Sequence, residues 1–272
     1  MKAANLPSDV GAFLRGRVAL LTGSSGGLGL AMAEALAAAG CRVALNGLQP
    51  ADAVEPARRA LEERAGVRVI YVQADVSTLA GVGHLVADVA ATLGDIDILV
   101  NNAVVRHFAP IVDFAPADWD RALAVNLSAA FHATRLALPS MRDRNFGRIF
   151  NMSSVYGARG TVNRVDYVTT KSALLGLTRA TALENLDRNV TCHAICPGSV
   201  LTPGTDERIT RIVRDQGLDR AEAERRFLQG KQPGGRFVPT RSIAELLLFL
   251  CGPVAQDMTG ALLPVEAGWL AS

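Results

Sequence analysis

Residues 17–29 read RVALLTGSSGGLG, a short apolar run followed at once by a glycine-rich loop. An alanine-rich helical pattern continues to about Ala39, and Gly40 follows it as a natural C-terminal cap. Glycines between a strand and a helix let the backbone approach a pyrophosphate, and the N-terminus of the helix favours its negative charge. The stretch therefore predicts a dinucleotide-binding unit, with a tight turn that holds no ligand as the alternative.

Apolar runs typical of strands recur along the rest of the chain. They span residues 42–46, 67–72, 96–101, 148–152, 190–195 and 261–265. Helical patterns separate them at residues 51–65, 79–93, 117–143, 165–187 and 242–250. Strands that alternate with helices indicate βαβ units and a parallel sheet covered on both faces. We expect a Rossmann-like, doubly wound α/β fold in which residues 1–272 form a single domain.

Two segments depart from this alternation. Residues 199–240 hold an arginine-rich helical pattern, at 206–215 and 221–230, where a short crossover would be expected. Long excursions from an α/β core often form lids, so we expect a substrate lid here, with a solvated insertion as the alternative. Residues 1–14 lack the pattern of a signal peptide, and we expect them to form a short surface arm.

The composition argues against several classes of function. Hydrophobic residues make up 49% and charged residues 20% of the chain, as in an ordinary globular protein. A net charge of +2 gives no sign of a nucleic-acid partner, and no apolar run has the length of a membrane span. The four cysteines are scattered without a C-x-x-C pair, so we expect no metal site and a reduced, cytoplasmic protein.

The stretch from Asn151 to Lys171 carries the chemistry that we expect. Tyr167 and Lys171 lie four residues apart, on one face of a helix that begins near Val165. An ammonium group near a phenol lowers the phenol's pKa, so Tyr167 could exchange a proton with a carbonyl or carbinol oxygen. Ser154, at the end of the preceding strand, could donate a hydrogen bond to the same oxygen. A surface pair is the alternative, and the glycine loop favours catalysis.

The spacing from Thr22 to Gly29, T-G-x-x-x-G-x-G, resembles the motif of the short-chain dehydrogenase/reductase family, and the resemblance covers nearly the whole chain. It implies a catalytic tetrad of Asn126, Ser154, Tyr167 and Lys171, in which Asn126 orients a water molecule and Lys171 also holds the nicotinamide ribose. The family resemblance further implies these cofactor contacts: Thr22, Gly23, Ser25, Gly27, Leu28, Gly29, Asn46, Asp75, Val76, Asn102, Ala103, Tyr167, Lys171, Pro197, Gly198, Val200 and Thr202.

Two details bear on the cofactor. The family usually has glycine where this chain has Val104, and a β-branched residue disfavours positive φ. We therefore expect negative φ or a shifted backbone there. A 2′-phosphate needs a cation, and neither the glycine loop nor Asn46–Pro50 contains one, so we expect NAD. Equal use of NADP would require a distant arginine: Arg15, Arg17 or Arg42.

Within the family, the chain is most similar to the D-3-hydroxybutyrate dehydrogenases. The similar stretches are Ala44–Gly47, Arg106–His107, Asn126–His132, Ala194–Gly198 and Lys231–Pro233. The resemblance implies that Ser154 and the positions that hold the carboxylate in those enzymes contact the substrate: here Arg106, Tyr156, Arg164 and Arg208.

Three of the four positions are arginines, where the resemblance implies two glutamines and a lysine in those enzymes; the fourth, Tyr156, replaces a histidine. Guanidinium groups bind carboxylate, sulfonate or phosphate as a bidentate fork. We expect Arg106, Arg164 and Arg208 to form one anion site, for a substrate more anionic or bulkier than 3-hydroxybutyrate. The alternative is that they face solvent or pair with Asp166, Asp206 or Glu207. We expect Asp166 itself to point away from the site and to pair with an arginine.

The sequence thus predicts an NAD-dependent oxidoreductase that interconverts a hydroxy acid and its keto acid. The alternatives are a reductase of an uncharged ketone and a nucleotide-binding scaffold without turnover. The family resemblance implies a homotetramer packed through the helices at 117–143 and 165–187, on one side of the sheet. Leu174, Leu175, Leu177 and Ala182 could contact the partner subunit or could face the sheet.

Overall fold

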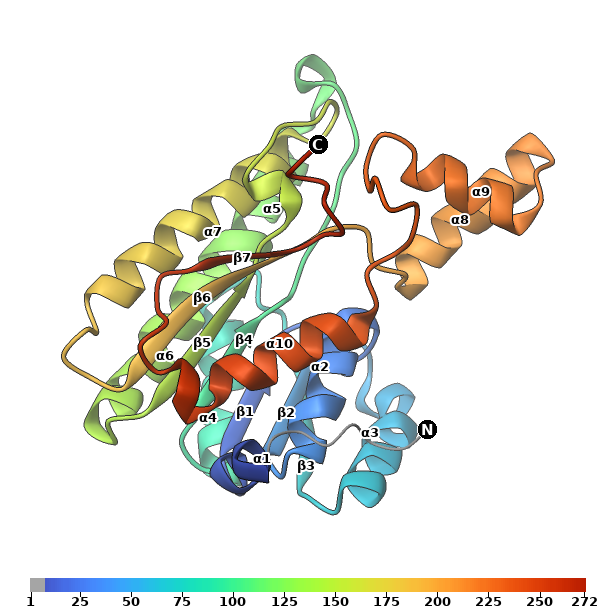
Figure 1. Ribbon diagram of the computed structural model, residues 1–272. Coiled ribbons are helices and arrows are strands. Elements are labelled where there is room, and N and C mark those ends of the chain that lie inside the picture. Colours follow the sequence, from blue (N-terminus) through green and yellow to red (C-terminus); the bar gives the residue numbers. More distant parts are fainter. Residues whose placement is uncertain (1–7) are drawn as a thin grey trace.

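The computed structural model describes residues 8–272 and contains a seven-stranded parallel sheet in the order β3-β2-β1-β4-β5-β6-β7 (Figure 1). The strands are β1 (Val18–Leu21), β2 (Arg42–Gly47), β3 (Val69–Gln73), β4 (Ile98–Asn101), β5 (Gly147–Met152), β6 (Val190–Pro197) and β7 (Leu262–Val265). The order reverses between β1 and β4, so the crevice for a ligand is expected at the carboxyl ends of these strands. The expected doubly wound α/β fold is confirmed.

Helices cover both faces of this sheet. The α-helices of the described chain are α1 (Ser8–Leu14), α2 (Gly27–Ala38), α3 (Ala51–Ala65), α4 (Leu79–Leu93), α5 (Pro116–Leu123), α6 (Ala129–Asp143), α7 (Val165–Leu183), α8 (Pro203–Gln216), α9 (Arg220–Leu228) and α10 (Thr240–Cys251), of which α8 and α9 project from the sheet. Every residue of β1, β5 and β6 is buried, including the polar Arg148 and Asn151 of β5 and His193 of β6, as expected for strands covered on both faces. None of the helices of the described chain is both long and apolar enough to span a membrane.

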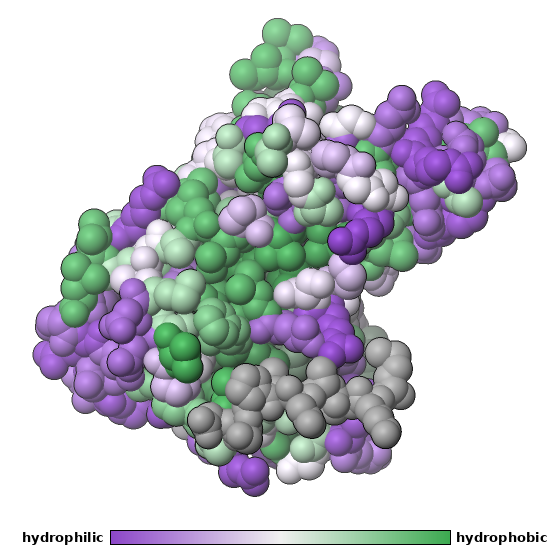
Figure 2. Space-filling model, viewed as in Figure 1, coloured by the Kyte–Doolittle hydropathy of each residue, from purple (hydrophilic) through white to green (hydrophobic). Residues whose placement is uncertain are grey.

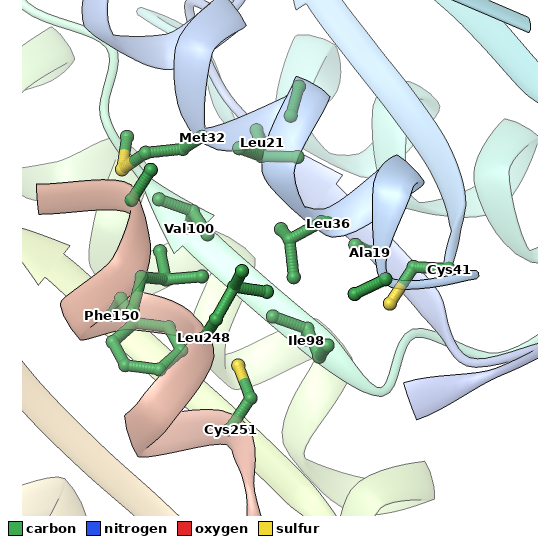
Figure 3. Packing of buried hydrophobic residues seen from close by; sticks show 14 of the residues in the cluster. Ala19, Leu21, Met32, Leu36, Cys41, Ile98, Val100, Phe150, Leu248 and Cys251 are labelled. Atoms are coloured by element: carbon green, nitrogen blue, oxygen red, sulfur yellow. The ribbon is translucent and has the colours of Figure 1, made fainter. Parts of the chain in front are cut away.

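One core lies between the sheet and helices α2 and α10. Figure 3 shows Leu36 of α2 and Leu248 of α10 meeting Val100 of β4 and Phe150 of β5. Truncating such a side chain to alanine typically costs about 2–5 kcal/mol of stability. This packing holds the first and last thirds of the chain against the same strands.

A second core covers the opposite face, beneath α4, α6 and α7. The helices at 117–143 and 165–187 therefore do lie on one side of the sheet. Of the four suggested subunit contacts, Leu174, Leu175 and Ala182 are buried within the subunit. Leu175 packs on Ala194 and Cys196 of β6, so this face of α7 packs against the sheet.

Two local expectations need correction. The suggested surface arm ends in helix α1, whose Val10 and Leu14 are buried in the core beneath α10; residues 1–7 lie outside the described part. The apolar spacing of these two residues accounts for the burial. The single helix expected at 117–143 is divided by a π-turn, Ala124–Ser128, between α5 and α6. Such wide turns are frequent at functional sites, and this one contains Asn126.

Helices α8 and α9 form a small unit that projects from the carboxyl edge of the sheet (Figure 1). Its two ends meet, because Val200 and Val238 form a β-bridge. Inside it, Ile209 of α8 packs with Phe227 of α9, while its outer surface is strongly polar (Figure 2). The arginine-rich pattern at 199–240 thus becomes two amphipathic helices with a core of their own.

Candidate active site

A cleft of about 1050 Å³ opens at the carboxyl ends of β1, β2, β4, β5 and β6, where α8 and α9 cover part of it. Nearly every residue that the sequence proposed for the cofactor, the substrate or catalysis lines this cleft. The exceptions are Thr22 and Asn126, which are buried behind its wall. Residues spread over most of the chain therefore meet at one place.

The glycine loop brings three backbone segments together at one end of the cleft. Gly23 has a φ of +59°, and a Cβ atom there would lie 2.8 Å from the Cα of Ala103. A Cβ on Gly29 would lie 2.6 Å from the carbonyl oxygen of Gly23. Only glycine fits at either position, and the amino end of α2 is left open to the cleft. These features fit a bound dinucleotide pyrophosphate.

The side chains of three expected cofactor contacts also hold the loop in shape. The Thr22 Oγ1 accepts hydrogen bonds from the backbone N–H groups of Asn102 and Ala103, both at 3.0 Å. Asn102 Nδ2 donates to the carbonyl oxygens of Thr22 and Gly23 at 3.0 and 2.8 Å. The side chain of Asn46 accepts from Gly23 N–H at 3.2 Å and donates to two carbonyl groups at the end of β3. The polar side-chain groups of Thr22 and Asn46 are thus engaged by the backbone.

The segment after β2 presents no cation to the cleft. Gly47, Leu48 and Gln49 line it, and the Ser25 hydroxyl donates to Gln49 Oε1 at 2.9 Å. Arg17 and Arg42, suggested as distant partners of a 2′-phosphate, lie at the opposite ends of the strands. Arg17 pairs there with Asp97 at 3.2 Å, and Arg42 donates to the carbonyl oxygen of Gly16.

The loop after β4 resolves the question raised by Val104. Positive φ is found at three non-glycine residues of the described chain, namely Asn145, Asn163 and Ala267. Val104 is not among them, so the loop uses the negative φ that a β-branched residue prefers. The loop is then held from behind, because Asn126 Oδ1 accepts from Val105 N–H at 2.8 Å and Asn126 Nδ2 donates to Val105 O at 3.1 Å.

The catalytic candidates meet in the middle of the cleft. Ser154 lies just beyond β5, where its Oγ accepts from the N–H of Tyr156 at 3.2 Å. Tyr167 is in the first turn of α7, and Lys171 lies one turn later. The Lys171 Nζ donates to the carbonyl oxygen of Met152, the last residue of β5, at 2.5 Å. Tyr167 and Lys171 are both almost fully buried.

The charges around Tyr167 favour its phenolate. Burial raises the pKa of the phenol, but Arg106, Lys171, the Ser154 hydroxyl and Arg164 together lower this pKa to about 8. Burial lowers the pKa of Lys171 to about 8 as well, against the opposing effect of Tyr167. A phenol with a pKa near neutrality is suited to exchange a proton with a substrate oxygen.

Two arginines lie directly against the tyrosine ring. The guanidinium carbon of Arg164 is 4.3 Å from the ring centroid of Tyr167 and 4.2 Å from that of Phe108. The guanidinium carbon of Arg106 is 5.6 Å from the Tyr167 ring. A β-bridge between Ala109 and Arg164 joins the loop after β4 to the start of α7 and so brings these groups together.

None of the three arginines pairs with a carboxylate of the described residues within 4.0 Å. The expected pairing of Asp166 with an arginine is wrong. Asp166 is fully buried and lies 3.0 Å from Nδ1 of His107, and its other oxygen accepts the N–H of Tyr167 at 2.6 Å. Asp206 pairs with Arg220 instead, at 2.6 Å. The arginines of the cleft are therefore left free for a ligand.

The family model for short chain dehydrogenases matches residues 17–212. This chain belongs to the short-chain dehydrogenase/reductase family. It is accordingly an oxidoreductase of the family that acts on CH–OH groups with a nicotinamide cofactor.

Relatives within the family agree over nearly the full length. The chain is 40% identical to a D-beta-hydroxybutyrate dehydrogenase of Cupriavidus necator, over 95% of this chain and 99% of the relative. It is 37% identical to an enzyme of the same name from Rhizobium meliloti, over 94% of this chain and 99% of the relative. Among solved structures, L-sorbose reductase of Gluconobacter frateurii, complexed with NADPH and L-sorbose, matches with a TM-score of 0.91 and 32% identity, over 95% and 98% of the two chains.

This short-chain dehydrogenase also brings residues to the cleft that the sequence analysis missed as site residues. Among them are Phe108, Phe227, Lys231 and Trp269. Lys231 lies in Lys231–Pro233, one of the stretches similar to the D-3-hydroxybutyrate dehydrogenases, and that similarity was the one signal for this residue. The others come from a loop, helix α9 and the C-terminal tail, and no sequence spacing connects them. Trp269 packs on Tyr156 with ring centroids 5.3 Å apart, and both rings line the cleft.

Proposed function

We propose that the protein is an NAD-dependent dehydrogenase that interconverts a hydroxy acid and its keto acid. The observation that carries the proposal is the position of Arg106 and Arg164, which lie against the ring of Tyr167 without a carboxylate partner. An anion bound there would place the adjoining carbinol carbon near the phenol. The names of the two hydroxybutyrate dehydrogenase relatives support the same substrate class.

The residues of the cleft fit the nicotinamide cofactor. We propose that the glycine loop and the start of α2 hold the pyrophosphate, Asp75 and Val76 the adenine, and Pro197–Thr202 the nicotinamide. Lys171 would hold the nicotinamide ribose. The cofactor, when bound, accepts or supplies the hydride. NAD is favoured over NADP because the segment after β2 offers a 2′-phosphate no cation.

The proposed roles of the catalytic residues follow from their places. Tyr167 takes the proton of the carbinol, or returns it to the carbonyl oxygen, and Ser154 donates a hydrogen bond to that oxygen. Lys171 and the two arginines stabilise the phenolate. Asn126 holds the loop that carries Arg106, and its π-turn is where we place a proton-relaying water. Tyr156 and Arg208 complete the substrate contacts.

The test is to compare 3-hydroxybutyrate with its neutral methyl ester in wild type, Arg164→Ala and Arg179→Ala. Arg179 is an exposed residue of α7, the helix that Arg164 precedes, and serves as the control. A charge-assisted contact is worth roughly 1.5–3 kcal/mol, so Arg164→Ala should lose about ten- to a hundredfold in kcat/KM for the acid. The ester should lose far less. Equal losses on both substrates would favour the uncharged-ketone alternative.

We further propose one oxidoreductase domain with residues 199–240 as its lid, assembled as a homotetramer. The outer edge of β7 has no strand partner in the described chain, and apolar surface surrounds it in Figure 2. Phe131 of α6 and Leu183 at the end of α7 are 47% and 68% exposed. Such surfaces mark interfaces. The four cysteines are free thiols, in keeping with the cytoplasm as the proposed location.

A further inference from the structure

The outer end of the cleft carries a second pair of cations, Arg208 and Lys231, both on the lid. The Nζ of Lys231 is 3.8 Å from the ring centroid of Phe227, and the guanidinium carbon of Arg208 is 4.9 Å from it. Phe227 belongs to the small core between α8 and α9. This distal pair is therefore positioned by the lid, independently of Tyr167.

The distal pair is distinct from the proximal pair, Arg106 and Arg164, which contacts the ring of Tyr167. Phe108 stands between the two pairs, with its ring centroid 4.2 Å from the guanidinium carbon of Arg164 and 5.9 Å from that of Arg208. Each pair thus has its own aromatic ring, and a third ring contacts both. The two pairs thus lie against different aromatic rings of the same cleft, which Arg121 and Arg211 also line.

Arg208 and Lys231 differ from the other unpaired cations of the lid in being partly buried, because Arg211, Arg226 and Arg236 are exposed. Arg214, Arg220 and Arg225 each form an ion pair on the lid surface. Arg208 and Lys231 are partly buried and have no carboxylate of the described residues within 4.0 Å. The one carboxylate of α8 that lines the cleft belongs to Glu207, which is exposed and joins neither of them.

The closeness of Lys231 and Arg208 to each other and to the proximal arginines is unfavourable when no anion is bound. Burial, Arg208 and Arg164 lower the pKa of Lys231 to about 8. Burial and Arg106 likewise lower the pKa of Arg208. Like charges held together out of water repel one another, and an anion placed between them reverses the sign of that interaction. Clusters of this kind are typical of binding sites.

Unused donors point the same way. Arg164 Nε and Trp269 Nε1 are buried without a hydrogen-bond acceptor, and both residues line the cleft. Buried donors in proteins are nearly always paired. A ligand with several acceptor oxygens would accept hydrogen bonds from both groups. A single small carboxylate at the proximal pair would not reach both.

We propose that the substrate is a dicarboxylic hydroxy acid, with one carboxylate on Arg106 and Arg164 and the second on Arg208 and Lys231 beneath the lid. The proposal rests on the proposed function and narrows its substrate class. The second carboxylate takes no part in the chemical step. It is held alike before and during hydride transfer, so its main effect is on KM.

The first test measures binding, so that it does not depend on turnover. NAD-saturated enzyme is titrated calorimetrically with succinate, glutarate and adipate, and with butyrate, valerate and hexanoate as monocarboxylates of equal length. At least one dicarboxylate should bind about tenfold or more tightly than its monocarboxylate, the worth of one charge-assisted contact. Dicarboxylates that bind no more tightly at any length would overturn the proposal.

Variants identify the residues. Lys231→Gln should remove the dicarboxylate advantage and leave monocarboxylate binding within about twofold, while Lys231→Arg should keep most of it. Arg226→Gln removes the same charge from an exposed place on the same lid, outside the cleft, and should change neither. Equal effects of Lys231→Gln on both ligand classes would show a structural role for Lys231 and would also overturn the proposal.

Turnover then separates this inference from the proposed function. The enzyme is assayed with 3-hydroxybutyrate, 3-hydroxyglutarate, 3-hydroxyadipate and neutral secondary alcohols. Oxidation of 3-hydroxybutyrate without any gain from a second carboxylate overturns the dicarboxylate proposal alone. If the enzyme oxidises the neutral alcohols and none of the hydroxy acids, the proposed function itself is overturned. A lower KM for a diacid, lost in Lys231→Gln, supports both.

Discussion

At the scale of single residues, the chemistry converges on the phenol of Tyr167. Lys171 reaches it from one turn along α7, as their spacing predicts. Arg106 and Arg164 reach it from the loop after β4 and from the residue before α7, and Arg106 has the larger effect on its pKa. In the proposed function, the same cations would therefore bind the substrate anion and activate the base.

Replacing Tyr167 with phenylalanine should abolish turnover and leave NADH binding largely intact. The change removes only the hydroxyl group, and general acid–base groups contribute about 10²–10⁴-fold to rate. NADH fluorescence titration measures binding, and steady-state kinetics measure turnover. A variant that retains more than half of the wild-type rate would exclude Tyr167 as the proton-transfer group.

The pH profile should report the charges around the phenol. Oxidation needs the phenolate, so kcat/KM should rise with pH through about 8, the pKa of Tyr167. Arg106 stabilises the phenolate, so Arg106→Ala should move this rise to higher pH. The loss of activity should be large at pH 7 and shrink in alkaline solution. The assay uses a neutral ester substrate, so that the loss of anion binding does not contribute to the change in kcat/KM. If Arg106→Ala has the same pH profile as the wild type, the role assigned to Arg106 is contradicted.

Cofactor preference should change when a cation is added after β2. Wild type should favour NAD over NADP by more than about tenfold in kcat/KM, because no cation faces the expected 2′-position. Leu48 lines the cleft and is 56% exposed, so Leu48→Arg should raise kcat/KM with NADP by about tenfold. Leu79→Arg adds the same charge outside the cleft and is the control. Equal use of both cofactors by the wild type would refute the preference.

At the scale of elements, the π-turn between α5 and α6 and the loop after β4 act together. The π-turn carries Asn126, whose side chain forms hydrogen bonds with both backbone groups of Val105. That contact fixes the loop from which Arg106 and Phe108 reach the cleft. The loop also contains Val104 with negative φ, so it is stiffer than a glycine-containing loop would be.

Val104→Gly tests this stiffness. Restoring the usual family residue should lower the free energy of unfolding by about 0.5–1 kcal/mol or more, because glycine adds freedom to the unfolded chain. It should not lower the KM for NAD, since the backbone already follows a suitable path. Urea denaturation and steady-state kinetics measure the two quantities. A tighter KM would mean that Val104 distorts the cofactor pocket.

At the scale of the whole molecule, the edge strand and the outer helices set the expected assembly. Light scattering at micromolar concentration should give a tetramer. Phe131→Lys places a charge on the exposed face of α6 and should shift the population towards smaller species. Leu79→Lys, at another exposed apolar position, should not. A monomeric wild type would refute the homotetramer.

Much of the fold could be predicted from local pattern. The seven strands, the glycine loop and the Tyr167 helix lie where the apolar runs and caps indicated, because strand and helix periodicities are local. Val10 and Leu14 were missed because a short helix becomes stable only by packing on a distant one. The π-turn was missed because it is a single wide turn inside a helix, and Ala124–Ser128 contains no glycine or proline to mark the place.

The amino-acid sequence by itself determined the family, the doubly wound sheet and the pairing of Tyr167 with Lys171, because each depends on neighbours within one or two elements. Only the tertiary structure decided that Arg164 stacks on Tyr167, that Asp166 pairs with His107 and that Lys231 joins Arg208 under the lid. Parallel strands bring their carboxyl ends to one edge, so loops remote in sequence meet there. Distance along the chain carries no information about which of their side chains will touch.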